Sequence, residues 1–214
     1  MVQLQTPEEL QFISNVAHWV EGSILLVVVA ISFAQSLGYA KSKAVQYLWP
    51  TLILIAGLFL PLYLLLLNGV DKVGDSARLI ISDNQQREHI LMASLLVAAG
   101  AVETLRRANV LKSERWRFVW PAALVLLGIV FAVHTQKGTP EAVAWATRRH
   151  FYLGSIIILA GLFKVADVLW GRKFKWLAFL WIGLLLVAAV LFITYREPEG
   201  AFRTEPLSVR QKEA

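Results

Sequence analysis

The chain has no cysteine among its 214 residues, and this absence removes several kinds of chemistry at once. Disulfides, thiolate metal sites and cysteine nucleophiles are excluded. Methionine is nearly absent too, since Met1 and Met92 are the only two, so no methionine-rich relay for a metal ion can cross the protein. The sequence also lacks an H-E-x-x-H motif, a glycine-rich phosphate loop and a serine nucleophile elbow. The four histidines are therefore the main candidates for chemistry.

Hydrophobic residues make up 57% of the chain, and they are gathered into runs too long for a soluble core. A bilayer core of about 30 Å needs about 20 apolar residues per helix. The sequence predicts an all-α integral membrane six-helix bundle over residues 1–195, followed by a polar tail, 196–214, that we expect to be disordered. The predicted helices span residues 7–38, 44–68, 84–107, 116–135, 140–171 and 174–195.

The formal net charge of +6 is explained by membrane topology rather than by nucleic acid. Lysine and arginine are dense in three short connections, which the positive-inside rule places in the cytoplasm. We therefore expect a protein of the bacterial cytoplasmic membrane with both termini in the periplasm. No basic region precedes the first apolar run, so no cleavable signal peptide is predicted. The basic residues that set this orientation are Lys41, Lys43, Arg106, Arg107, Lys112, Arg115, Arg117, Arg172, Lys173 and Lys175.

One pattern, H-x-x-x-[GA]-S-[IL]-[LI], occurs three times, beginning at His18, His89 and His150. A tryptophan follows each of these histidines after 31 residues. This periodicity predicts three helical hairpin repeats. The tryptophans are expected at the cytoplasmic membrane interface, where indole rings are favoured; they are Trp49, Trp120 and Trp181.

All four histidines are predicted to lie at one level, near the periplasmic face. Thr6-Pro7 and Thr139-Pro140 begin helices about three turns before His18 and His150, and His134 lies fourteen residues beyond the interfacial Trp120. A polar residue stands outward of each repeat histidine and apolar residues stand inward of it. This is typical of a pocket that opens outward. Ionisable side chains at membrane depth are functional candidates by default.

The first hypothesis is a transition metal site. His18, His89, His134 and His150 would converge on copper or another transition metal ion, since neutral imidazole suits copper, zinc and iron. Glu21 or Met92, each one turn inward of a repeat histidine, could add a ligand or a supporting contact.

The second hypothesis is a b-type haem with two of the histidines as axial ligands. Gly22 and Gly154 would let the flat macrocycle approach the backbone. The basic residues Arg87, Arg148 and Arg149 would pair with the propionates.

The alternative without a cofactor is close helix packing, which small residues such as Gly22, Ala93 and Gly154 serve in lipid. The histidines would then form hydrogen bonds between helices, and the protein would be a structural subunit of a membrane complex. Glu103 and Asp167 are expected to be ion-pair partners near the cytoplasmic interface rather than proton carriers.

The four histidines of the six-helix body resemble those of the copper-resistance D family and related b-type cytochromes, which are helical bundles with histidines near helix ends. The resemblance implies copper handling or copper-based redox chemistry at the periplasmic side, or electron transfer through a single haem with quinone or a periplasmic carrier. The chain departs from two-haem cytochromes at the positions fourteen residues after each repeat histidine, which are Ser32, Glu103 and Lys164. A second haem on the cytoplasmic side is therefore not expected.

Overall fold

The computed structural model describes residues 6–39, 42–68 and 83–203, with the backbone alone at residues 60 and 63–68. These residues form six α-helices and one short 3-10 helix, and the only β-type pairing among them is a single bridge between Gly138 and Ala201. The all-α prediction is confirmed. The helices are α1 (Pro7–Ser36), α2 (Lys43–Asn68), α4 (Asn84–Arg107), η2 (Glu114–Phe118), α5 (Val119–Ala132), α6 (Pro140–Trp170) and α7 (Trp176–Ile193).

The helix starts follow local rules. The Thr6 side chain accepts from the backbone N–H of Glu9, and the Glu9 carboxylate accepts from the backbone N–H of Thr6, which completes a capping box before α1. Thr139 caps α6 and Asp83 caps α4 through the N–H of Gln85. The α5 helix ends at Ala132, so His134 lies in the loop that follows and not inside a helix as predicted.

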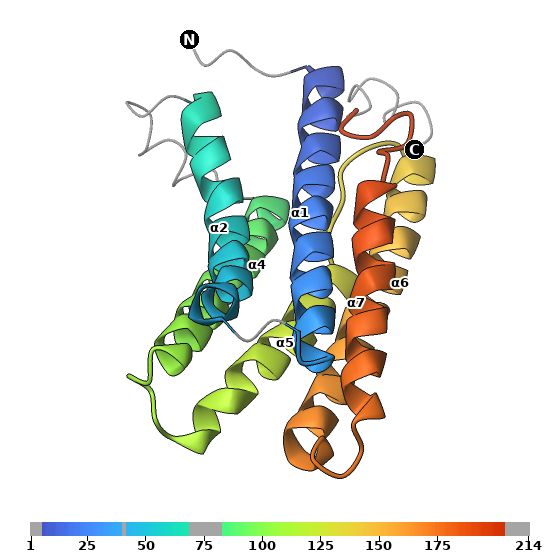
Figure 1. Cartoon of the computed structure of the whole chain (residues 1–214). Helices are drawn as coiled ribbons and strands as arrows, with labels where there is room; N and C mark the ends of the chain where they lie inside the picture. The colour runs from blue at the N-terminus through green and yellow to red at the C-terminus, as the bar shows by residue number, and fades with distance from the viewer. Residues whose placement is uncertain (1–5, 40–41, 69–82, 204–214) are drawn as a thin grey trace, which may run out of the picture.

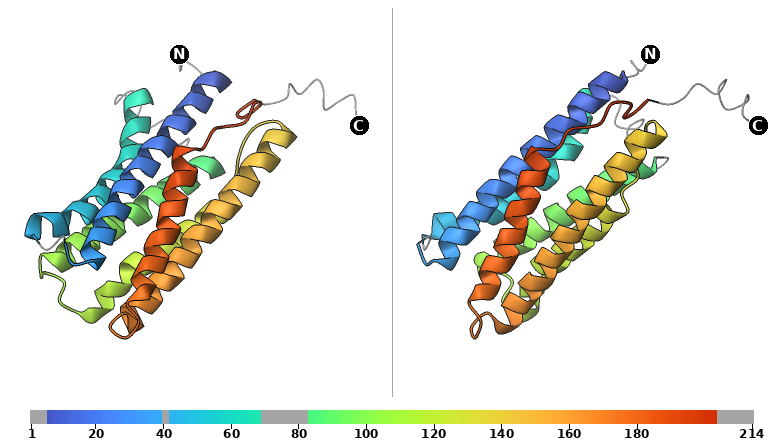
Figure 2. Two further views of the ribbon diagram at one scale, coloured as in Figure 1. Left: turned by 45° about the vertical axis from the view of Figure 1, so that its right-hand side comes forward. Right: turned by 90° about the vertical axis from the view of Figure 1, so that its right-hand side faces the viewer.

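The six helices form a closed ring. Each helix packs on its neighbours in the chain and α7 packs on α1, while no helices touch across the ring within the described ranges. Figures 1 and 2 show the helices running alongside one another, with the start of α1 and the segment after α7 at the same end of the bundle. We call this the terminal end. The closest pairs are α5–α6, α2–α4 and α1–α7, which join successive predicted hairpins rather than the two helices of one hairpin.

Glycines form the seams of these close pairs. A Cβ atom on Gly22 would lie 2.6 Å from Cβ of Phe192 on α7, and one on Gly154 would lie 2.4 Å from the carbonyl oxygen of Gly128 on α5. A Cβ atom on Gly100 would lie 2.7 Å from the backbone nitrogen of Leu54 on α2. Small residues at such positions let helix backbones approach in lipid.

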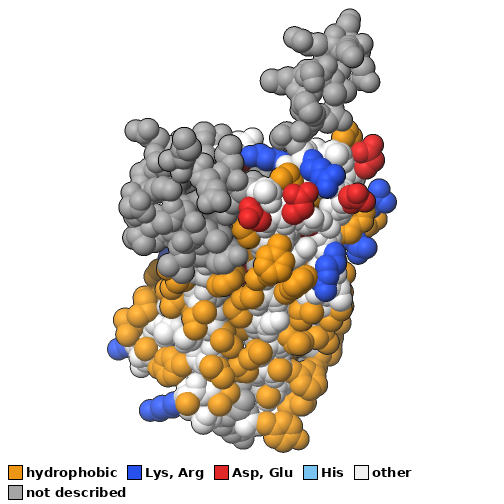
Figure 3. All heavy atoms as spheres, turned by 90° about the horizontal axis from the view of Figure 1, so that it is seen from above, with side chains coloured by type: hydrophobic (Ala, Val, Ile, Leu, Met, Phe, Trp, Pro, Cys, Tyr) orange, Lys and Arg blue, Asp and Glu red, His pale blue; other side chains and the backbone are white. Residues whose placement is uncertain are grey.

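Five helical segments are long and apolar enough to cross a membrane, with η2 and α5 counted together as Glu114–Ala132, and α2 contributes a shorter apolar stretch, Lys43–Phe59. Figure 3, seen toward the terminal end, shows most of the acidic and basic side chains in view gathered in one region and hydrophobic side chains over much of the remaining described surface. A surface of this kind belongs to a membrane protein, in which lipid covers the exposed apolar side chains.

The end opposite the termini is filled by aromatic rings and paired charges. Trp49, Trp120 and Trp181, which were predicted near the cytoplasmic interface, are buried inside the bundle at this end, with the rings of Trp49 and Trp120 5.5 Å apart. The carboxylate of Glu103 pairs with Arg106 at 2.7 Å and with Arg107 at 3.0 Å.

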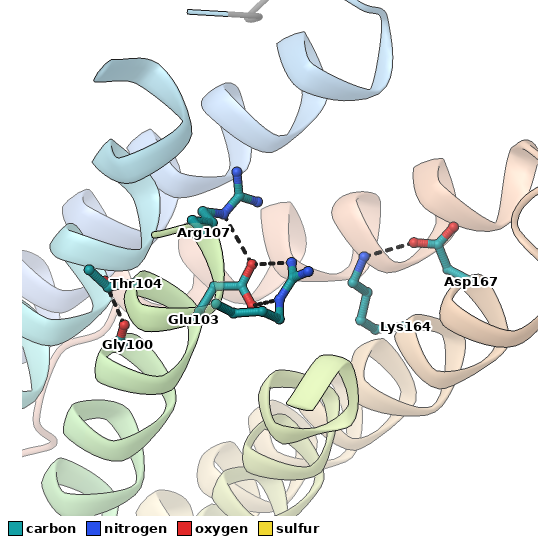
Figure 4. Close-up of polar contacts among 7 residues, drawn as sticks. Gly100, Glu103, Thr104, Arg107, Lys164 and Asp167 are labelled. Atoms are coloured by element: carbon teal, nitrogen blue, oxygen red, sulfur yellow. Dashed lines mark hydrogen bonds and ion pairs between the residues drawn. The ribbon is translucent and has the colours of Figure 1, made fainter. Parts of the chain in front are cut away.

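A second ion pair at this end joins Asp167 to Lys164 at 2.8 Å, and Asp167 also accepts a hydrogen bond from Trp181. Figure 4 shows both charged groups. The prediction that Glu103 and Asp167 serve as ion-pair partners is confirmed.

Candidate functional site

A cavity of about 370 Å³ occupies the centre of the ring and is lined by residues from all six helices. All four histidines line it, together with polar groups toward the terminal end. Deeper in the bundle the lining is apolar except for Glu21, and includes Ile24, Ile53, Ala56, Leu124 and Leu185. The volume falls in the range of small-molecule sites, about 300–1,000 Å³, and far exceeds that of one metal ion.

The four imidazole rings form a continuous row. The ring centres of His18 and His150 are 5.9 Å apart, those of His150 and His134 are 4.9 Å apart, and those of His134 and His89 are 4.7 Å apart. The rings come from α1, α6, the loop after α5, and α4. The structure therefore brings together all four residues that the sequence singled out.

Backbone carbonyl groups of their own helices fix the tautomer of two of the histidines. Nδ1 of His18 lies 2.7 Å from the carbonyl oxygen of Ser14, and Nδ1 of His89 lies 2.8 Å from the carbonyl oxygen of Gln85. A carbonyl oxygen only accepts, so Nδ1 carries the hydrogen in each ring. The Nε2 atom of each neutral ring then presents a lone pair, which suits a metal ion or a hydrogen-bond donor.

The other two histidines are buried with poorly paired nitrogen atoms. His134 is 5% exposed and His150 is 2% exposed, and Nδ1 of neither makes a hydrogen bond of good geometry among the described residues. The backbone of Ala146, one turn before His150 on α6, is the polar neighbour of the His150 ring. Nδ1 of His134 lies 2.8 Å from Oε2 of Glu88, a distance at which a protonated ring would form an ion pair with the carboxylate. That Glu88 oxygen also accepts from the backbone N–H and the hydroxyl of Thr135. Burial and the neighbouring imidazoles lower the pKa of His134 to about 2, whereas the Glu88 carboxylate beside Nδ1 favours the protonated ring.

The segment after α7 covers the terminal end of the site. Glu197 is 6% exposed and accepts hydrogen bonds from Ser14 at 2.6 Å and from Gln136 at 3.1 and 3.2 Å. Burial raises the pKa of Glu197, and these hydrogen bonds oppose that rise. The backbone N–H of Phe202 donates to the carbonyl of Lys137. Residues 196–203 are thus part of the folded body, contrary to the predicted boundary at 195, whereas 204–214 lie outside the described residues.

Tyr195 joins the histidine row from the end of α7. Its ring stacks on His18 with centres 4.1 Å apart and lies 5.6 Å from the His150 ring. Its buried hydroxyl lies next to the Glu197 carboxylate without a hydrogen bond of good geometry. Burial, together with the charge of Glu197 and the contact with its side chain, raises the pKa of Tyr195. The equivalent residue of the first hairpin, Tyr63, is described by its backbone alone.

Neighbouring imidazoles in the row are spaced so that two of them can bind the same metal ion. Two imidazoles that bind one ion through nitrogen at about 2.0 Å place their ring centres about 5–6 Å apart, and the three observed separations lie at or just below this range. Within residues 6–39, 42–68 and 83–203, no three His, Cys, Asp or Glu side chains already have the arrangement of a metal site. A third ligand therefore requires a side-chain rotation. Glu21 and Met92 line the same cavity, within reach of a supporting role.

The residues predicted to hold a haem are placed less favourably. Gly22 and Gly154 lie in the seams with α7 and α5, as the packing alternative requires, and neither lines the cavity. Arg87, Arg148 and Arg149 are exposed and do not line it either. Arg87 donates to the side-chain oxygen of Asn84 on its own helix, and the Arg149 guanidinium lies 5.1 Å from the centre of the Trp145 ring.

Glu88 and Glu197 were not predicted from the sequence, whereas the spacing from Trp181 placed Tyr195 at the depth of the histidines and left open whether its ring turns toward them. Glu88 directly precedes His89, and Tyr195 occupies the position equivalent to His134, so both carried a signal. Glu197 carried none, because it stands in a polar stretch that gives no sign of folding back onto α1.

No family model, curated protein or solved structure matches this chain. The assignment of function therefore rests on the geometry of the histidine row and the cavity.

Proposed function

We propose that this is a protein of the bacterial cytoplasmic membrane that binds copper through His18, His89, His134 and His150 near the periplasmic face. The observation that carries the proposal is the convergence of four imidazole rings, two of them almost fully buried, on one cavity. Ionisable side chains at membrane depth are costly, and a bound ion is one explanation for a cluster of them.

The donor set favours copper among metal ions. The row offers neutral imidazole nitrogens and no thiolate, which excludes sulfur-rich sites and disfavours calcium and magnesium. Copper(II) binds nitrogen sites most tightly of the divalent first-row ions. Pairs of imidazoles at the observed spacing also suit copper(I), a softer ion that accepts few ligands.

The position of the row favours exchange on one side of the membrane. The basic connections between α1 and α2, α4 and α5, and α6 and α7 lie at the opposite end, which the positive-inside rule assigns to the cytoplasm. That end is filled by the buried tryptophans and ion pairs. Copper handling or copper-based redox chemistry with a periplasmic carrier fits this arrangement better than a channel does.

Metal analysis of purified protein tests the proposal. We expect copper to copurify or to bind on titration at about one ion per chain, and His89→Ala and His150→Ala to lower its content. Arg148→Ala removes an exposed charge and should leave copper content unchanged. Wild-type protein that retains no copper under these conditions would refute the proposal.

A b-type haem is the second candidate, because the His18 and His150 ring centres are 5.9 Å apart. Axial imidazoles on opposite faces of a haem have ring centres about 6 Å apart at iron–nitrogen distances near 2 Å. A haem would then exchange electrons with quinone or a periplasmic carrier. Absorption spectra of oxidised and reduced protein decide this, since the haem hypothesis fails without a Soret band. Protein that holds neither cofactor but copurifies with fixed partners would favour a structural subunit.

A further inference from the structure

Glu197 is fixed on the terminal end of the bundle by both its backbone and its side chain. Its N–H donates to the side-chain oxygen of Asn15 at 2.7 Å, and its carbonyl accepts from the side chain of Gln11 at 2.9 Å. Its carboxylate points into the bundle and is almost fully buried. Figure 2 shows the segment after α7 passing between the first turns of α1 and α6. Hydrogen bonds to the first turns of α1 thus hold Glu197 in one place, although it lies beyond the end of α7.

One arm of hydrogen bonds connects Glu197 to His18. The Ser14 hydroxyl donates to Oε1 of Glu197 at 2.6 Å. The carbonyl of the same Ser14 accepts the Nδ1 hydrogen of His18 at 2.7 Å. The carboxylate therefore fixes the turn of α1 on which the His18 ring rests.

A second arm connects Glu197 to His89. The side-chain nitrogen of Gln136 donates to both Glu197 oxygens, and the Gln136 oxygen accepts from the side-chain nitrogen of Gln85 at 3.1 Å. The carbonyl of Gln85 accepts the Nδ1 hydrogen of His89 at 2.8 Å. Gln85 is itself 6% exposed, so this arm runs through the interior.

The carboxylate sets the direction of both arms because it only accepts, whereas each glutamine both donates and accepts. With Glu197 ionised, Gln136 must turn its nitrogen toward Glu197 and its oxygen toward Gln85. We propose that Glu197 is a positioning residue that orients His18 and His89 together, so that their free nitrogens face the shared cavity. Its consequence for metal binding rests on the proposed function, but the orientation itself does not.

Nitrogen NMR of the histidine rings tests the orientation directly in metal-free protein. The chain has only four histidines, so selective ¹⁵N-histidine labelling in detergent gives a small set of signals. In Glu197→Gln the new amide donor opposes the Gln136 donor, and we expect the ring signals of His18 and His89 to shift. Glu199→Gln removes the same charge from a more exposed residue two positions away and should leave them unchanged.

A swap of the two partners separates positioning from general damage. Gln136→Glu alone should disturb the rings, because it places a second carboxylate opposite Glu197. Glu197→Gln combined with Gln136→Glu places a donor opposite a carboxylate again, and the carboxylate now at position 136 can still accept from Gln85. We expect the double variant to restore the wild-type ring signals. Unshifted His18 and His89 signals in Glu197→Gln, or a double variant no better than the singles, would overturn the inference.

Copper titration of the same variants measures the consequence. Loss of a group that orients a metal ligand costs about 10–100-fold in affinity, and we expect that loss in Glu197→Gln and its recovery in the double variant. If wild-type protein binds no copper while the NMR shifts follow the pattern above, the proposed function fails and the positioning role of Glu197 stands.

Discussion

The buried polar groups at the two ends of the bundle differ in how well they are paired. At the end opposite the termini, Glu103 is paired with two arginines and Asp167 with a lysine and an indole. At the terminal end, Nδ1 of His134 and His150 and the Tyr195 hydroxyl are buried without hydrogen bonds of good geometry among the described residues, although Glu88, the Ala146 backbone and Glu197 lie beside them. Since a poorly paired buried group is destabilising, its retention points to a role other than folding. The paired end is a structural closure, and the poorly paired end is the candidate site.

The largest expected effect is on metal binding at the poorly paired end. His150→Leu removes a proposed ligand and should lower copper affinity by at least about a hundredfold, more than the loss of a supporting group costs. It also removes a buried nitrogen without a hydrogen bond of good geometry, so thermal unfolding in detergent should show unchanged or higher stability without metal. A large fall in metal-free stability would indicate that His150 is a packing residue.

The seams between helices give the next effect. Gly154→Ala places a Cβ atom 2.4 Å from a backbone oxygen of α5 and should lower the free energy of unfolding by about 1–3 kcal/mol. Gly183 on α7 has no described atom within 4 Å of its added Cβ and is the matched control. Gly183→Ala should be neutral or stabilise by up to about 1 kcal/mol because alanine favours the helix. Equal shifts of the unfolding temperature in the two variants would contradict the claim that Gly154 is needed for the close packing of α6 on α5.

Substitution of a charged residue at the paired end should lower stability and leave copper affinity unchanged, the opposite of what is expected for the histidine row. Glu103→Ala removes the shared partner of Arg106 and Arg107 and should lower stability by about 1–3 kcal/mol. Copper affinity should not change. Glu114→Ala breaks an exposed pair with Arg117 and serves as the control, with little effect on unfolding. A loss of copper in Glu103→Ala would remove the distinction between the two ends.

The smallest effect concerns acid stability at the mouth of the cavity. Partial burial by itself would raise the pKa of Asp83, but Lys137 and the N–H groups of Gln85 and Gln86 outweigh it and hold the pKa below its ordinary value. Asp83 therefore stabilises the fold above its unfolded-state pKa, and this contribution is lost as pH falls through the lowered value. Unfolding of Asp83→Asn should be less sensitive to pH in that acid range. An unchanged pH profile would contradict the assignment.

The sequence predicted the helices and the histidine row because both depend on local patterns. Long apolar runs place the helices, and fixed spacing along a helix places His18, His89 and His150 at equivalent heights. The packing of Trp49 against Trp120 inside the ring of helices was not predicted, because the preference of indole for an interface concerns depth in the membrane and not the neighbours of the side chain. The roles of Glu197 and Tyr195 depend on how the segment after α7 meets α1, a contact between residues about 180 positions apart that no local pattern encodes.

The most direct test is X-ray absorption at the copper edge on protein loaded with one equivalent of copper. The account predicts nitrogen ligands at about 2.0 Å with the outer-shell scattering of at least two imidazoles, reduced in His134→Ala and in His150→Leu. Copper bound without imidazole scattering, or with a signal identical in wild type and both variants, would contradict the central claim.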